Sequence, residues 1–419
     1  MNESADPITT PFHGWRVLGL CTLSQFVAIG CTMYLLGVFI QPLAQLFGAT
    51  QGQIGSASGV FAVAGCILSP FLGILADRGK SKVIMLCGAV SMTLGLILLS
   101  QAQGLLQAAL VCVLLQAPAA AMLGTIPTTV MVAQWFTRRR GFAIGITAAG
   151  ISMGGFVMPP LAAWLLGQFG PRQSLMVLGC GVGLILIPAI WRLAVVKPAD
   201  IGQHPDGIPL SQAEVDTQAA APSIALGEIF RRTDFWTIGL SVGIISFAGI
   251  LIITYLAPYA KATGMSLQNS AFLLSLYAIS GIAGKFTTGW LSDKFPPRRI
   301  MTATLVMAAI GWLPIVFADD IFAFAITAST VGFAMGGLIP VWATLIALNF
   351  GLQNFGRVRG IMALVLVAFT IIPGPLGGYL YDSTGSYATA FGLLWWCLPL
   401  GVTMSLFIAG PPSPTPATE

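Results

Sequence analysis

Long apolar segments recur along the whole chain and are separated by short polar stretches or by glycine and proline turns. A helix needs about 20 consecutive apolar residues to cross the hydrocarbon core of a bilayer. Dividing the chain at its charges and turns predicts twelve membrane-spanning helices, at 15–42, 53–76, 83–101, 105–134, 141–165, 173–193, 235–259, 269–292, 300–317, 321–348, 359–380 and 388–409.

These helices fall into two groups of six, with a polar segment between them. We therefore expect an all-α membrane protein with twelve transmembrane helices in two pseudo-symmetric six-helix bundles. The predicted N-terminal bundle covers residues 1–196, a cytoplasmic linker covers 197–233, and the C-terminal bundle covers 234–419.

The composition supports the same class of protein. Hydrophobic residues make up 56% of the chain and charged residues only 8%, whereas soluble domains have about 25% charged residues. We therefore expect the protein to be embedded in a lipid bilayer. The sequence contains no basic run of the kind that binds nucleic acid. The seven cysteines lie in apolar segments without a CxxC pair, which favours buried side chains over metal ligands. We expect a monomer without a cofactor or a metal.

Lysine and arginine residues gather at alternate helix ends. With the N-terminus inside the cell, sixteen of the nineteen are cytoplasmic; Arg172 and Lys261 lie on the other side, and Lys285 lies within a span. Cytoplasmic loops of membrane proteins carry such an excess of positive charge. The pattern predicts a multi-pass protein of the cell (inner) membrane with both termini in the cytoplasm.

One loop sequence occurs in both halves. Residues 73–78 read GILADR after the second predicted helix, and residues 289–294 read GWLSDK after the eighth. Two further pairs, Gly124–Pro127 with Gly337–Pro340 and Arg140-Gly141 with Arg359-Gly360, repeat at nearly the same offset. The two six-helix halves therefore repeat one design.

The repeated loop is similar to the signature of the major facilitator superfamily. The stretch Trp135–Gly145 (WFTRRRGFAIG), together with His13-Gly14-Trp15 and the segment 197–207, resembles the monocarboxylate-porter branch of that superfamily. Tyr34–Phe39 is similar to the first helix of the related oxalate/formate antiporters, although Cys31 stands where those proteins usually carry glycine. The resemblance implies two halves that alternate access to a central cavity lined by helices 1, 4, 7 and 10.

The resemblance also implies a gate at the repeated loops. It implies that Asp77 faces the start of helix 11 at Arg359 and Gly360. It likewise implies that Asp293 faces the start of helix 5 at Arg140 and Gly141, because a helix N-terminus favours negative charge. The alternative is that these loops are solvated and only direct membrane topology. The residues implicated in gating are Asp77, Arg78, Asp293, Lys294, Arg140 and Arg359.

Lys285 is the only charge in the interior of a predicted span, since the others lie in loops or at span ends, and such a residue suggests a functional site. The alternative is that it extends to the cytoplasmic surface, since Asp293 lies only eight residues further along. Helical side chains lean toward the N-terminus of their helix, which favours the membrane centre. By resemblance, the related porters carry arginine here. Lysine replaces it, and Gly281 stands where animal monocarboxylate porters carry aspartate.

Other candidate ligands are polar or aromatic residues in the middle of predicted spans. Each of them could instead form a hydrogen bond between helices or lie at the membrane interface. Besides Lys285, the candidate substrate-binding residues are Tyr34, Tyr277, Gln116, Thr125, Ser246, Tyr255 and Trp342, with Gln25 and Thr330 on the same helices.

These observations predict a secondary active transporter that moves a small monocarboxylate or similar organic anion by alternating access, with proton symport left open. The alternatives are a drug or amphiphile exporter of the same superfamily and a non-transporting membrane receptor or sensor. Exporters of cations usually carry a carboxylate within the membrane, and none is present in the predicted spans. No nucleophile–base pair, metal cluster or phosphate loop points to an enzyme.

Overall fold

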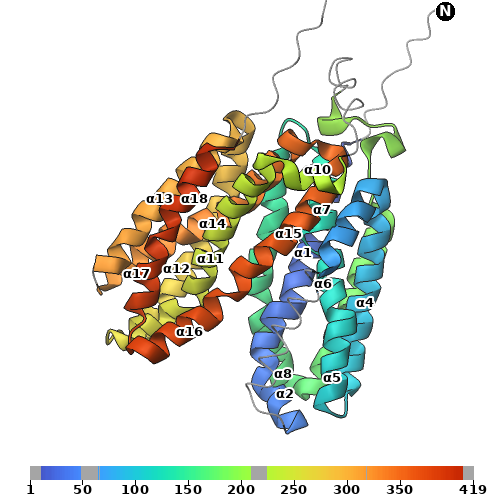
Figure 1. The fold of residues 1–419 in the computed structure, drawn as a ribbon. Helices are drawn as coiled ribbons and strands as arrows, with labels where there is room; N and C mark the ends of the chain where they lie inside the picture. Colours follow the sequence, from blue (N-terminus) through green and yellow to red (C-terminus); the bar gives the residue numbers. More distant parts are fainter. Residues whose placement is uncertain (1–10, 49–64, 66, 209–223, 318, 409–419) are drawn as a thin grey trace, which may run out of the picture.

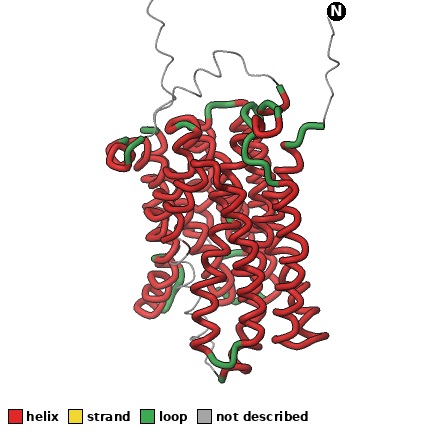
Figure 2. Tube along the Cα trace, turned by 90° about the vertical axis from the view of Figure 1, so that its right-hand side faces the viewer, coloured by secondary structure: helices red, strands yellow, loops and turns green. Residues whose placement is uncertain are grey.

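The computed structural model describes residues 11–48, 65, 67–208, 224–317 and 319–408. Within these ranges the chain consists of helices and short loops, without a β-strand (Figure 2). Most of the predicted span 53–76 lies outside the described residues; its last part is helical from Ile67.

The first bundle contains the blue to green helices of Figure 1. Its elements are α1 (Gly14–Ile29), η1 (Gly30–Tyr34), α2 (Leu35–Phe47), η2 (Ala76–Lys80), α4 (Ser81–Gln101), α5 (Leu105–Val111), η3 (Cys112–Gln116), α6 (Ala117–Leu123), α7 (Thr125–Trp135) and α8 (Arg140–Leu193).

Short elements follow before the second bundle. They are η4 (Pro198–Ile201), η5 (Pro205–Gly207) and α10 (Leu226–Arg231). The second bundle, green to red in Figure 1, contains α11 (Thr233–Ala262), α12 (Leu267–Lys294), α13 (Pro297–Phe317), α14 (Ile321–Phe350), η6 (Leu352–Asn354), α15 (Phe355–Ile371), α16 (Pro373–Thr384), α17 (Ala388–Trp395) and α18 (Cys397–Leu406).

Nine helical stretches of the described chain are long and apolar enough to cross a bilayer. Two of them join successive predicted passes: Ile67–Gln101 contains the described end of 53–76 and the whole of 83–101, and Arg140–Leu193 contains both 141–165 and 173–193. In the second, 54 residues at 1.5 Å per residue would reach roughly 80 Å, and the helix is interrupted at Gly170, where φ is 71°. Helix α12, which carries Lys285 among several serines, is the remaining pass.

Several of the passes are broken within the membrane. The first contains the π-helical turn η1, the fourth contains η3 and a non-helical residue at Gly124, and the eleventh divides at Ile372 before Pro373. Proline removes a backbone donor and π-turns insert an extra residue, so each break changes the direction of the side chains beyond it.

The two bundles approach each other at the end where α1 begins, and their ribbons diverge toward the opposite end, between α2 and α16 (Figure 1). We call the first of these the closed end. There, glycines bring the bundles together: a Cβ at Gly141 would lie 2.5 Å from the carbonyl oxygen of Gly289, and one at Gly145 would lie 2.5 Å from that of Lys285. Gly73 similarly contacts the backbone of Gly356. Small residues thus permit close backbone contact between the bundles.

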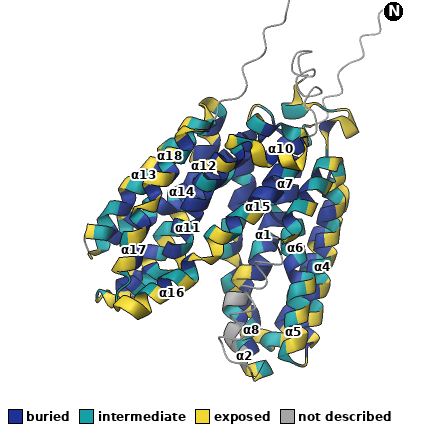
Figure 3. Cartoon of the chain, in the orientation of Figure 1, coloured by how far each residue is buried: buried dark blue, intermediate teal, exposed yellow. Residues whose placement is uncertain are grey.

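Large apolar side chains cover much of the outer surface, including Leu106, Phe156, Leu184, Ile310 and Phe317. Figure 3 shows exposed positions along the outer faces of α4, α13 and α17, with buried positions toward the interior of each bundle. An apolar surface of this extent suits hydrocarbon rather than water. The predicted all-α membrane architecture is confirmed.

Candidate functional site

Lys285 lies where α12 crosses α8 of the other bundle. Its side chain is 6% exposed, and Nζ donates a hydrogen bond to Oγ of Ser152 on α8. Within the described part of the chain, no carboxylate pairs with this ammonium. A charged lysine near the middle of a membrane helix costs about 2.5–3.5 kcal/mol on insertion scales. The arrangement leaves a positive charge between the bundles, with one neutral partner.

The direction of the Lys285 side chain follows from its two neighbours on α8. Its backbone lies beside Gly145, whereas its amine reaches Ser152, seven residues further along that helix. Seven residues correspond to about 10 Å of helix, and α8 begins at the closed end. The side chain therefore extends away from the closed end, toward the middle of the molecule, rather than to the nearby surface.

Two tyrosines approach the same region from different bundles. The ring of Tyr34 lies across Gly155, one turn beyond Ser152 on α8, so that a Cβ at Gly155 would lie 2.7 Å from the tyrosine hydroxyl. Tyr277 lies two turns before Lys285 on α12, and its buried hydroxyl has no hydrogen-bond partner among the described residues. The two hydroxyls are near enough to interact electrostatically. Lys285 and Tyr34 thus meet α8 at the neighbouring residues Ser152 and Gly155, and Tyr277 lies on the same helix as Lys285.

The remaining candidates on the first bundle mostly face their own bundle. The buried amide of Gln116 lies against Gly95 of α4, with no described hydrogen-bond partner for either of its side-chain atoms. Gln25 donates through Nε2 to Oγ1 of Thr128 at 2.7 Å, which joins α1 to α7. Thr125 is half-buried at the start of α7. These residues contact helices of the first bundle rather than Lys285.

The candidates on the second bundle also make contacts inside it. Ser246 donates to the carbonyl oxygen of Val242 on its own helix at 2.8 Å, and Thr330 likewise bonds to its own helix. The hydroxyl of Tyr255 donates to the carbonyl oxygen of Gly374 and thereby joins α11 to α16. The structure therefore does not bring these three side chains to Lys285.

Trp342 packs against Arg359, a buried cation that the sequence pattern does not predict. The guanidinium of Arg359 lies 4.2 Å from the centre of the Trp342 ring, and Arg359 is only 2% exposed. Its Nη1 has no hydrogen-bond partner in the described structure. The distribution of positive charges in the sequence predicts Arg359 at a cytoplasmic helix end. The helix begins earlier, at Phe355, so Arg359 lies in its second turn and is buried. Lys285 is therefore not the only buried cation.

The carboxylate of Asp77 binds the N-terminus of α15. The backbone N–H of Gly356 donates to Oδ1 and that of Arg357 donates to Oδ2, both at 2.7 Å. These partners lie about one turn before Arg359 and Gly360, the residues expected from the sequence, because α15 starts at Phe355. The contact joins the first bundle to the second.

The equivalent contact in the other direction involves Asp293. The backbone N–H of Gly141 donates to Oδ1 at 2.6 Å, and that of Phe142 donates to Oδ2 at 2.9 Å. Both amides belong to the first turn of α8, where the helix macrodipole favours an anion. The two aspartates thus form a pair of reciprocal contacts across the closed end.

The basic residues beside these aspartates play different parts. Arg78 is exposed, and Lys294 is exposed with Nζ 3.9 Å from the centre of the Trp290 ring. Arg140 is 8% exposed, and its Nε donates to the carbonyl oxygen of Phe136 at 3.3 Å. Of these cations only Arg140 is enclosed by the closed end.

A third aspartate, which the sequence analysis did not single out, also binds backbone amides at this end. The N–H groups of Thr137 and Arg138 donate to Oδ2 of Asp206 at 2.8 and 2.7 Å. Asp206 lies in η5 with a φ of 57°, a left-handed conformation that aspartate tolerates better than most residues. The polar segment after the first bundle is thereby fastened to the loop between α7 and α8.

Comparisons with known proteins agree with this architecture. A family model described as Major Facilitator Superfamily matches residues 21–286 and 244–419. Monocarboxylate transporter 12 of Rattus norvegicus is 24% identical over 402 residues, which cover 90% of this chain and 82% of that protein. Monocarboxylate transporter 13 of the same species is 24% identical over 383 residues, with 90% and 85% covered. The resemblance to monocarboxylate porters is thus confirmed.

Solved structures show the same fold. The crystal structure of the transporter FucP in the outward conformation has a TM-score of 0.67 at 19% identity, covering 93% of this chain and 97% of FucP. A variant of the E. coli fucose:proton symporter FucP has a TM-score of 0.66 at 19% identity, with 95% and 100% covered. With its membrane-spanning helices in two bundles and a family match over nearly its whole length, this chain belongs to the Major Facilitator Superfamily and is a membrane transporter, not an enzyme.

Proposed function

We propose that this transporter carries a small monocarboxylate or a similar organic anion by alternating access, and that Lys285 binds the carboxylate. The observation that supports the proposal most is the buried ammonium of Lys285 between the two bundles, held by Ser152 without a described acidic partner. A carboxylate entering this place would supply the missing negative charge. The relatives named as monocarboxylate transporters support the same class of substrate.

The surrounding groups suit a singly charged anion. Lysine provides one positive charge and up to three donors, but it lacks the planar pair of donors with which arginine grips a carboxylate. The hydroxyl groups of Ser152, Tyr34 and Tyr277 can each donate a hydrogen bond to the second carboxylate oxygen or to a substituent. A dianion would leave one charge unbalanced at this position. We therefore favour small monoanions.

The two bundles and the gate fit alternating access. We propose that the closed end faces the cytoplasm, because most lysines and arginines lie at that end, and that the inner membrane holds the protein in this orientation. Asp77 and Asp293 then fasten the cytoplasmic gate in the outward-open state. These contacts break when the halves, proposed to comprise 1–196 and 234–419, rock to the inward-open state.

Uptake into proteoliposomes tests the proposal. Purified protein is reconstituted, and the uptake of a panel of labelled monocarboxylates is compared between the wild type, Lys285→Ala and Lys261→Ala. Lys261 is an exposed lysine at the opposite end of the molecule and is the matched control. We expect uptake of at least one monocarboxylate by the wild type and by Lys261→Ala, and its loss in Lys285→Ala.

A pH gradient in the same vesicles tests proton coupling. Proton symport predicts that an acidic exterior drives the monocarboxylate above its equilibrium concentration inside. Unchanged uptake in Lys285→Ala would contradict the assignment of the site. Failure to transport any monocarboxylate, together with transport of a cationic amphiphile, would favour the drug-exporter alternative.

A further inference from the structure

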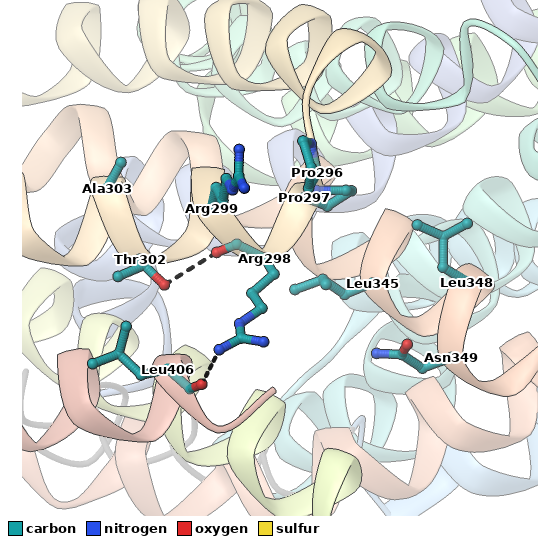
Figure 4. Close-up of a pocket in the computed structure, with 10 residues that line it drawn as sticks. All are labelled: Pro296, Pro297, Arg298, Arg299, Thr302, Ala303, Leu345, Leu348, Asn349 and Leu406. Carbon is teal, nitrogen blue, oxygen red and sulfur yellow. Dashed lines mark hydrogen bonds between the residues drawn. The ribbon is translucent and has the colours of Figure 1, made fainter. Parts of the chain in front are cut away.

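A cavity separate from the bundle interface opens at the closed end of the C-terminal bundle. It has a volume of about 680 Å³ and lies between the start of α13, the end of α14 and the end of α18 (Figure 4). The proposed transport mechanism uses none of its residues. Two of them, Arg298 and Arg299, belong to the basic run that follows the repeated loop.

The guanidinium of Arg298 is held in a fixed position beside this cavity. Its Nη2 donates to the carbonyl oxygen of Leu406 at the end of α18. Its own carbonyl oxygen accepts a hydrogen bond from Oγ1 of Thr302 at 3.1 Å, and Oγ of Ser405 donates to that threonine hydroxyl at 2.9 Å. These contacts join α13 to α18, and the one to Leu406 limits the positions that the guanidinium takes before a ligand binds.

Asn349 provides a second donor on the opposite wall. Figure 4 shows its side-chain amide facing the guanidinium of Arg298 across the cavity. The amide nitrogen is buried, and no described residue accepts a hydrogen bond from it. A buried donor without an acceptor costs about 1–3 kcal/mol. The cavity therefore presents the cation of Arg298, and the buried N–H groups of Asn349 reach the same space once its amide turns.

These groups together select an anion with several acceptor oxygens. Arginine binds phosphate through parallel hydrogen bonds, and the exposed Arg299 adds a second positive charge at the rim. The N-terminus of α13, a helix of 21 residues, lies beside both arginines and contributes further positive potential. No carboxylate is present among the residues that line the cavity.

The apolar part of the lining points to a lipid rather than a free ion. Leu345 and Leu348 form the wall beside Asn349. On α13, Ala303 lines the cavity, and Val306 and Ile310, at helical spacing on the same face, are exposed large apolar residues. This face continues from the cavity onto the outer surface of the bundle, so an acyl chain could follow it while the headgroup stays at the arginines.

We propose that this cavity binds the phosphate group of an anionic phospholipid, with Arg298 and Asn349 as ligands of the phosphate oxygens and with an acyl chain along α13. The site is located where the helices end, which is the depth of the headgroups in a bilayer. A zwitterionic phosphatidylcholine is disfavoured because its choline cation would lie near Arg298 and Arg299. Inorganic phosphate supplies the same oxygens without the apolar contact.

Binding to the purified full-length protein in detergent tests this proposal. The ligands are dioctanoyl phosphatidylglycerol, dioctanoyl phosphatidylcholine and inorganic phosphate, each measured by native mass spectrometry and by the shift in unfolding temperature. The variants are Arg298→Gln and Asn349→Leu. The matched control is Arg192→Gln, which removes an exposed arginine at the same end of the other bundle.

We expect phosphatidylglycerol to bind more tightly than either of the other ligands. Arg298→Gln should weaken its binding about tenfold, the loss expected for one charge-assisted hydrogen bond, and Arg192→Gln should leave it unchanged. Asn349→Leu should weaken binding while raising or preserving the unfolding temperature without ligand, because an unsatisfied donor is removed. Equal binding by the wild type and Arg298→Gln would overturn the proposal, as would inorganic phosphate binding as tightly as the lipid.

Discussion

The crossing of α8 and α12 at Gly145 limits how closely the two bundles can approach at the closed end. A Cβ at this position would lie 2.5 Å from the carbonyl oxygen of Lys285 and 3.4 Å from its carbonyl carbon. Real Cβ atoms almost never lie closer than 3.0 Å to such an atom. Because the obstructing atoms belong to the backbone, no side-chain rotation relieves the overlap, and the helices must separate by about 0.5–0.9 Å.

We therefore predict that Gly145→Ala shifts the transporter away from the state in which the closed end, the proposed gate, is shut. Overpacking of this kind costs typically 1–3 kcal/mol. In the proposed alternating access the helices part at this crossing when the gate opens, so the cost falls on the closed state alone. The ratio of closed to open molecules should then fall by roughly 5- to 150-fold, which corresponds to that energy.

Hydrogen exchange at the start of α8 measures this shift. Asp293 accepts hydrogen bonds from the amides of Gly141 and Phe142, and the proposed gate opening would break them, so the exchange of these amides should accelerate in Gly145→Ala. The matched control is Gly167→Ala, on the same helix, where an added Cβ meets no atom within 4 Å. Unfolding temperatures establish that both variants fold. Unchanged exchange in a folded Gly145→Ala would refute the reasoning.

Three further substitutions, with Thr330→Val as a control, test the gate and the site. Asp293→Asn replaces charge-assisted hydrogen bonds, each contributing about 1.5–3 kcal/mol, and should raise the exchange of the α8 amides and the spin-label distance across the closed end. Asp206→Ala removes the carboxylate oxygen that accepts from two backbone N–H groups and leaves a non-glycine residue without a polar side chain at positive φ, so it should lower the unfolding temperature without changing substrate affinity. Tyr34→Phe deletes one hydroxyl and should raise KM for the carboxylate about five- to tenfold, while Thr330→Val, which loses only a contact within its own helix, should leave KM unchanged.

The membrane passes could be predicted from the sequence because their apolar length is a direct requirement of the bilayer. The residues at which the helices begin could not be predicted, and the contacts at the gate therefore differ from those expected. Helix α15 starts at Phe355 rather than at 359, so Asp77 meets Gly356 and Arg357, and Arg359 becomes buried. The distribution of positive charges indicates on which side of the membrane a helix end lies, but it does not indicate whether an individual residue there is buried.

The π-turns explain why the direction of some side chains differs from the expectation. The turn η3 ends at Gln116 and adds a residue to the helical repeat, so the facing of Gln116 does not follow from regular helical spacing; it contacts Gly95 inside the bundle. Ser152 could not be predicted as a partner of Lys285, because a single serine in an apolar helix belongs to no recognisable sequence pattern. Its position beside Lys285 results from the crossing of α8 and α12, which joins residues 133 positions apart.

The affinity of Lys285 variants for a carboxylate and for its neutral amide tests the central claim most directly. Calorimetry would compare the wild type, Lys285→Gln and Lys261→Gln, with the monocarboxylate that is taken up best and with the uncharged amide of the same acid. We predict that Lys285→Gln weakens binding of the carboxylate at least about tenfold, while the amide binds both proteins alike and Lys261→Gln changes neither. Equal affinity of the wild type and Lys285→Gln for the carboxylate would contradict the assignment of Lys285 as the anion-binding residue.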